Sequence, residues 1–154
     1  RKLDEGQYAA IILAAAGLIR LQLHMRIRQL IAVENSIPAV GQGALGIEIN
    51  ANRVDLLEIL APLNHEDTQL CVEAERGFSR ALAGSCTVPL GAYAVRDGDT
   101  IHMTGFVASV DGTQMLREKI TGEATNADAV GRALAAKLVA RGADKILAEL
   151  DGHK

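Results

Sequence analysis

The pattern of hydrophobic and polar positions changes near residue 64 of the chain. Before that point, residues 9–15 form an unbroken apolar run and residues 44–49 form a second strand-like run. Short continuous apolar runs are typical of strands buried in an α/β sheet. Residues 53–61 predict a short amphipathic helix, which Pro62 ends. Together these elements show no closed hydrophobic core of their own.

From residue 64 onward the pattern predicts a separate α+β unit. Apolar residues at helical spacing over residues 70–82 predict a helix, which Asn64 or Asp67 caps. Two Asp-Gly pairs, at 97–98 and 111–112, separate strand-like runs and predict hairpin turns. A final helical pattern contains Gly142, which we expect to bend or interrupt it. The predicted elements are a helix over 64–82, antiparallel strands over 87–95, 101–109 and 114–120, and a helix over 127–150.

The composition of the chain argues against a protein that binds nucleic acid, spans a membrane or depends on disulfides. Hydrophobic residues make up 49% of the 154 residues, but aromatic residues only 3%, so the core must be aliphatic. The net charge of -3 provides no field that attracts nucleic acid. The longest apolar run, residues 8–19, is too short to span a bilayer, and two cysteines do not make a disulfide framework. We therefore expect a cytoplasmic protein that binds neither nucleic acid nor membrane.

The first residues suggest that the chain begins within a fold. It starts with Arg1 rather than Met, and residues 1–6 resemble the end of a helix with its stop glycine, Gly6. We expect the chain to be a fragment.

Cys86 is the strongest candidate for chemistry. It follows Gly84 and Ser85, between the predicted end of a helix and the predicted start of a strand, where small neighbours leave the sulfur accessible. A thiolate is a strong nucleophile near neutral pH. A free cysteine is also often a small buried hydrophobic residue, and the local sequence leaves both interpretations open. Cys71 lies on the apolar stripe of the predicted helix, which favours a structural role.

Three other positions are candidates for binding. Arg20 follows the first apolar run, and Arg76 lies on the helix that leads to Cys86. Each can bind a carboxylate bidentately or remain a solvated surface residue. Gln42 lies between two glycines that lack the dinucleotide fingerprint and the Walker lysine, so a tight backbone crossing is favoured over a phosphate site. The four histidines are scattered, and no metal site is predicted.

From the residues alone, two further functions remain open. The chain could be a non-catalytic α+β binding module, which predicts an unmodified Cys86 whose replacement has no effect. It could instead be a cysteine hydrolase or acyltransferase that uses Cys86 with a histidine base. That function predicts labelling by thiol alkylators and a base within hydrogen-bond reach of the sulfur.

Taken in order, several segments resemble the C-terminal half of the porphobilinogen deaminase (hydroxymethylbilane synthase) family. They are residues 8–18 with Arg20-Leu21, residues 38–48, Ala74-Glu75-Arg76, Gly84-Ser85-Cys86-Thr87-Val88-Pro89 and Asp111-Gly112. Their order and spacing resemble the family over essentially the whole chain. The family usually has a second glycine where Ser85 stands, and serine is a small replacement.

The resemblance implies a three-domain protein. The first two domains of the family are α/β units like the lobes of periplasmic binding proteins, with the active site in the cleft. The third is a small α+β domain that carries the cofactor cysteine. On this plan residues 1–37 close domain two, residues 38–62 return to domain one, and residues 63–154 form domain three.

The resemblance also implies an activity and a set of site residues. The family joins four porphobilinogen molecules into hydroxymethylbilane and releases ammonia, in tetrapyrrole (haem) biosynthesis. A dipyrromethane cofactor primes the chain from a cysteine thioether, and the matching position is Cys86. Arg20 and Arg76 match arginines that hold the acetate and propionate groups, and Gln42 matches a position near the substrate cleft.

The family's general acid/base is an aspartate in the N-terminal half. The resemblance therefore places no catalytic residue in this chain and makes the missing half its expected partner. We expect the fragment alone to be inactive.

Overall fold

The computed structural model describes residues 1–82 and 89–151. The chain divides into two compact units, Arg1–Ser36 and Ile37–Lys154.

The first unit contains little regular structure. Its elements are the short helix α1 (Ala15–Arg20) and a 3-10 turn, His24–Arg26. The predicted strand at residues 9–15 is wrong, because residues 9–14 form neither helix nor strand and Ile12 is 83% exposed. A strand needs a neighbouring strand to pair its peptide groups, and residues 1–36 provide none.

The second unit begins with an irregular segment. The predicted strand at residues 44–49 is also wrong, since no described strand pairs with it and Leu45 is 96% exposed. The predicted helix over 53–61 is confirmed as α2 (Asp55–Leu60). Pro62 lies in the 3-10 turn that follows, Ala61–Leu63, where a missing N–H costs little.

The rest of the second unit has the predicted α+β order. It contains α3 (Glu66–Leu82), β1 (Leu90–Asp97), β2 (Thr100–Ala108), β3 (Met115–Glu123), the 3-10 turn Ala124–Asn126, α4 (Ala127–Ala140) and α5 (Ala143–Asp151). The three strands form an antiparallel sheet in the order β1-β2-β3. Gly98 and Gly112 take positive φ angles of 58° and 71° in the two connections, as the Asp-Gly pairs predict. Gly142, with φ 99°, separates α4 from α5.

The start of α3 differs from the prediction. The ring Nδ1 of His65 accepts the Thr68 N–H at 3.3 Å, so His65 supplies the cap rather than Asn64 or Asp67. Asn64 donates instead to Gln69 Oε1 at 2.7 Å. The carboxylate of Asp67 is occupied by Arg96, at 2.8 Å.

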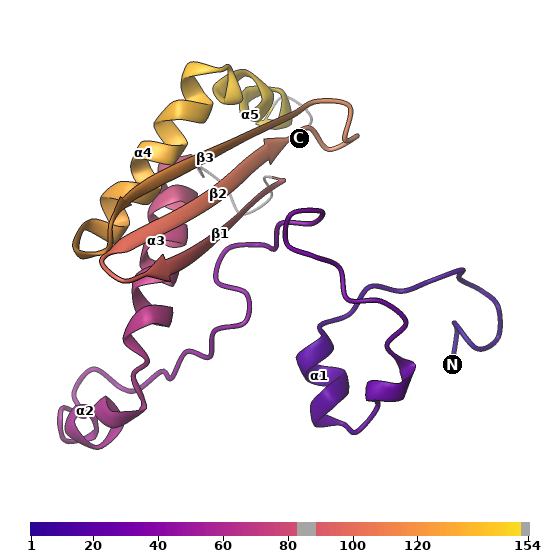
Figure 1. Ribbon diagram of the computed structural model, residues 1–154, viewed down its shortest axis with the longest axis horizontal. Helices are drawn as coiled ribbons and strands as arrows, with labels where there is room; N and C mark the ends of the chain where they lie inside the picture. Colours follow the sequence, from indigo (N-terminus) through magenta and orange to yellow (C-terminus); the bar gives the residue numbers. More distant parts are fainter. Residues whose placement is uncertain (83–88, 152–154) are drawn as a thin grey trace. The chain divides into compact units, whose positions relative to one another are not determined.

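One core holds this unit together. Helices α3 and α4 lie side by side on one face of the sheet (Figure 1). Alternate residues of β2, including Ile101, Met103 and Val107, are buried. The largest fully buried side chains are those of Phe78, Ile101, Met103, Val107, Leu134 and Leu138. The core is therefore almost entirely aliphatic, as the composition predicts. Over residues 1–82 and 89–151, no helix is long and apolar enough to cross a membrane.

Candidate functional site

Helix α3 places two consecutive charged residues in opposite environments. Glu75 is buried, with 6% of its surface exposed, whereas Arg76 is exposed. Successive residues of an α-helix point about 100° apart, which separates their side chains. Arg76 makes no hydrogen bond or ion pair with the residues that the structure describes. Its guanidinium is therefore available to a ligand that carries a carboxylate.

The Glu75 carboxylate is held by two backbone donors from distant parts of the unit. Its Oε2 accepts the N–H of Gly41 at 2.8 Å, and its Oε1 accepts the N–H of Ala94 in β1 at 3.0 Å. Burial raises the pKa of Glu75, and these two hydrogen bonds offset part of that effect. The carboxylate thus joins α3, β1 and the segment around Gly41.

The segment around Gly41 also follows the edge of the sheet. The carbonyl of Pro38 accepts the N–H of Ala92 in β1 at 3.2 Å. Gly41 and Gly43 have φ angles of 75° and 80°, a region that L-residues seldom adopt, and Gln42 lies between them. The glycines thus turn the backbone sharply on both sides of Gln42, consistent with the predicted tight crossing.

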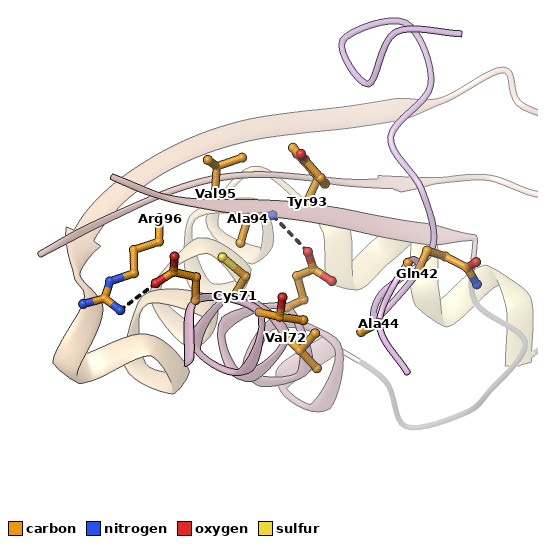
Figure 2. A pocket seen from close by; sticks show the side chains of 12 residues that line it. Gln42, Ala44, Cys71, Val72, Tyr93, Ala94, Val95 and Arg96 are labelled. Atoms are coloured by element: carbon orange, nitrogen blue, oxygen red, sulfur yellow. Dashed lines mark hydrogen bonds and ion pairs between the residues drawn. The ribbon is translucent and has the colours of Figure 1, made fainter. Parts of the chain in front are cut away.

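A cavity of about 350 Å³ lies between α3, β1 and residues 42–44 (Figure 2). It is lined by Gln42, Gly43, Ala44, Asp67, Thr68, Cys71, Val72, Glu75, Tyr93, Ala94, Val95 and Arg96. At one end, Arg96 of β1 pairs with Asp67 of α3 at 2.8 Å. Burial is the main cause that raises the pKa of the Cys71 thiol. Cys71 therefore has little thiolate character, in keeping with the structural role predicted for it.

Arg20 is the last residue of α1, in the first unit. The helix ends in a Schellman arrangement, in which Leu23 N–H bonds Leu18 O at 2.8 Å and Gln22 N–H bonds Ile19 O at 2.9 Å. Gln22 takes the left-handed conformation at φ 60° that this ending requires. Arg20 is exposed and makes no hydrogen bond or ion pair within the described part of the chain.

The structure brings only some of the predicted site residues together. Gln42 lines the cavity, whereas Arg76 does not, and Arg20 belongs to the other unit. Cys86 lies outside the described residues. In residues 1–82 and 89–151, no three histidine, cysteine or acidic side chains are grouped to hold a metal.

Sequence reasoning missed Glu75 as a site residue. Its position was nevertheless informative, because it follows Cys71 by four residues and precedes Phe78 by three, on the apolar stripe of α3. A carboxylate on a buried stripe must find donors elsewhere in the fold. A charged residue at a position that the helical pattern predicts to be buried was therefore the signal that could have identified Glu75 as a site residue.

Comparison with known proteins identifies the family. Residues 1–58 match the family model described as porphobilinogen deaminase, dipyromethane cofactor binding domain. Residues 69–140 match the model described as porphobilinogen deaminase, C-terminal domain. The chain belongs to the porphobilinogen deaminase family. This membership favours the deaminase over the binding module and the cysteine hydrolase.

Curated relatives agree with the two models. The chain is 72% identical to porphobilinogen deaminase of Methylobacillus flagellatus over 150 residues, which are 97% of this chain and 48% of that protein. It is 54% identical to the Nitrosomonas europaea enzyme over 150 residues, 97% of this chain and 49% of that protein. It is 53% identical to the enzyme of Neisseria meningitidis serogroup B over 146 residues, 95% of this chain and 47% of that protein. The chain spans about half the length of the curated relatives that it matches.

The two family models divide the candidate residues. The cofactor-binding model covers Arg20 and Gln42, whereas the C-terminal model covers Glu75, Arg76 and Cys86. In this porphobilinogen deaminase family member, the contact between Glu75 and Gly41 therefore links the two matched regions within the second unit.

Proposed function

We propose that this chain is the C-terminal half of a porphobilinogen deaminase (hydroxymethylbilane synthase), a cytoplasmic transferase. The full-length enzyme joins four porphobilinogen molecules into hydroxymethylbilane and releases ammonia at each addition. Family membership and the coverage of about half of each relative support this proposal.

The observation that carries the proposal is the guanidinium of Arg76, which has no hydrogen bond or ion pair with the described residues. Helix α3 presents it to solvent and ends at Leu82, just before the segment that contains Cys86. An exposed arginine with no partner among the described residues is suited to a polyanionic ligand attached nearby along the chain. We propose Cys86 as the thioether attachment point of the dipyrromethane cofactor. When bound, this group supplies the electron-rich pyrrole carbon that attacks the first substrate.

The proposed roles of the remaining residues follow from charge. Each pyrrole ring of substrate and product carries an acetate and a propionate, so negative charge accumulates as the chain grows. Arg20 and Arg76 are both exposed and unpaired within the described residues, and we assign them to carboxylate binding. Gln42, held between two glycines at the cavity, is assigned a place near the substrate cleft. No residue of this chain is assigned the role of general acid/base, which belongs to the N-terminal half.

The domain assignment is part of the same proposal. Residues 1–37 are the C-terminal part of domain two. Residues 38–62 are a segment of domain one, to which the chain returns, and residues 63–154 form domain three. Domains one and two resemble the lobes of periplasmic binding proteins. Large apolar side chains before residue 64 are exposed in this chain, including Ile12, Met25, Leu45 and Leu63. An apolar surface of this kind is normally buried against another part of a protein. We propose that the N-terminal half packs against it.

The deciding experiment is the intact mass of the full-length protein and of two cysteine variants. We expect the parent to exceed its sequence mass by two linked pyrrole units, and the Cys86→Ser variant to lack this excess. Cys71→Ser is the matched control, because Cys71 is the other cysteine of the chain, and this variant should keep the added mass. An unmodified parent, or a Cys86→Ser variant that keeps the excess, would refute the assignment.

A second experiment tests the fragment. Residues 1–154 alone should form no hydroxymethylbilane from porphobilinogen, and activity should return when the N-terminal half is supplied. Turnover by the isolated fragment would place the general acid/base in this chain and contradict the proposal.

A further inference from the structure

Glu75 is a buried charge with an unusual set of partners. Among the described residues its carboxylate is bonded by two backbone N–H groups, at 2.8 Å from Gly41 and 3.0 Å from Ala94. Burying a carboxylate is unfavourable unless both oxygens are well bonded. An apolar residue would complete the stripe of α3 without this cost. The carboxylate therefore serves a purpose other than filling the core.

The segment before Gln42 is attached to the fold through the Pro38 carbonyl, which accepts the Ala92 N–H, and through Val40, which packs against the core. Around Gln42, the described contacts of the backbone are the Gln42 N–H to Ala39 O, at 3.3 Å, and the Gly41 N–H to Glu75. The flanking glycines have no atom within 4 Å of the position where a side chain would begin. Two open glycines give the loop conformational freedom. The bond from Gly41 to the carboxylate is what fixes this loop to α3.

The second hydrogen bond of Glu75 adds to the core packing that orients α3. The Ala94 N–H ties Glu75 to β1, so the helix cannot rotate about its axis without breaking a hydrogen bond to a charged group. Arg76 is the next residue, and its direction is set by the rotation of the helix. One carboxylate therefore bonds both the loop that carries Gln42 and the strand on which the helix that carries Arg76 packs.

We propose that Glu75 is a positioning residue, which holds the Gln42 loop and the Arg76 guanidinium in a fixed relation by accepting the N–H groups of Gly41 and Ala94. This inference rests on the proposed function, because it assumes that Gln42 and Arg76 contact the pyrrole carboxylates. In this proposal Glu75 acts through Gln42 and Arg76 rather than on the ligand itself.

The geometry predicts how substitutions act. Two N–H donors need two acceptors, and a glutamine offers one carbonyl oxygen and one NH₂ group. Glu75→Gln therefore breaks one of the two bonds while it keeps nearly the same volume. Glu73 provides the matched control, because it is an exposed glutamate on the same helix with no bond to the described residues.

The test uses the full-length, cofactor-loaded protein and its Glu75→Gln and Glu73→Gln variants. Intact mass first shows whether the cofactor is attached, which tests the proposed function separately. With the cofactor present, we expect Glu75→Gln to raise KM for porphobilinogen about tenfold, the effect of one lost charge-assisted hydrogen bond. Its kcat should change much less, and Glu73→Gln should behave like the parent. Unchanged KM in Glu75→Gln would refute the positioning role.

A double-mutant cycle separates positioning from general destabilisation. If Glu75 acts through Gln42 and Arg76, the effect of Glu75→Gln on KM should largely disappear in a background that carries both Gln42→Ala and Arg76→Ala. Additive effects would show that Glu75 has only a structural role.

Amide hydrogen exchange tests the hydrogen bond from Gly41 to Glu75 in the unmodified protein, even if Glu75→Gln fails to fold. The Gly41 N–H should exchange at least tenfold more slowly than the Gly43 N–H, which has no partner among the described residues. Equal exchange rates would show that Glu75 does not hold the Gly41 N–H, and would refute the positioning role.

Discussion

Gly131 of α4 lies directly against the backbone of Ala74 in α3. A Cβ atom at position 131 would lie 1.9 Å from the Ala74 carbonyl oxygen and 2.6 Å from the Phe78 nitrogen. Both obstructing atoms belong to the backbone, so rotation of a side chain cannot relieve the contact. The absence of a side chain at Gly131 therefore sets how closely the two helices pack.

Gly131→Ala is expected to destabilise the protein although alanine favours helices. The helix propensity of alanine would stabilise α4 by about 1 kcal/mol. Separating α3 from α4 to make room costs more, roughly 3 kcal/mol, as in overpacked cores. Thermal or urea unfolding of the full-length protein measures the difference. Gly46→Ala is the control, because nothing lies within 4 Å of its Cβ position. A Gly131→Ala variant as stable as Gly46→Ala would show that the helices can separate freely.

Arg76→Ala is expected to weaken binding without affecting stability. Its guanidinium has no bond to lose among the described residues, while a pyrrole carboxylate would lose a charge-assisted hydrogen bond. KM for porphobilinogen should rise about tenfold or more.

Arg80→Ala is the control for Arg76→Ala on the same helix. Arg80 pairs with Asp128 of α4 at 2.5 Å, and this exposed pair contributes about 1 kcal/mol at most. KM should stay unchanged while the melting temperature falls slightly. If Arg80→Ala raised KM and Arg76→Ala did not, the proposed role of Arg76 in carboxylate binding would be wrong.

Asp111 is expected to make the β2–β3 turn sensitive to acid. The Ser109 hydroxyl and then the Thr113 N–H, at 2.6 and 3.1 Å, lower the pKa of its carboxyl. A carboxyl whose pKa is lower in the folded state stabilises the fold above its ordinary pKa, near 3.9. This contribution is lost as the pH falls from that value through the lowered folded pKa.

A pH series of unfolding measurements on the parent and on Asp111→Asn tests this. The parent should lose stability relative to the variant in that acidic window, because the amide does not titrate. Parallel pH profiles of parent and variant would contradict the prediction.

Cys71 is expected to react slowly with alkylating reagents. Burial raises the pKa of its thiol, and the neighbouring carboxylates of Glu75 and Asp67 add to this effect. Iodoacetamide at about pH 8 should therefore label Cys71 more slowly in the folded protein than in urea, as followed by peptide mass spectrometry. Equal rates in the two conditions would mean that the cavity does not protect the sulfur.

Predictions from local pattern succeeded where the structural partners are close in sequence. The two Asp-Gly pairs predicted the hairpins, and Gly142 predicted the interruption between α4 and α5. They failed at residues 9–15 and 44–49, which are apolar but form no strand here. An apolar run indicates burial, but a strand also needs a pairing partner from another part of a fold.

By itself, the sequence determined the order of elements from residue 64 onward, the family, and the residues proposed for chemistry, Arg20, Gln42, Arg76 and Cys86. Only the tertiary structure decided that Glu75 joins α3 to β1 and to the Gln42 loop. The donors of Glu75 lie 34 and 19 residues away in the chain. Helical and strand periodicities describe neighbours within a few positions, so they show that a carboxylate is buried but cannot show which backbone groups bond to it.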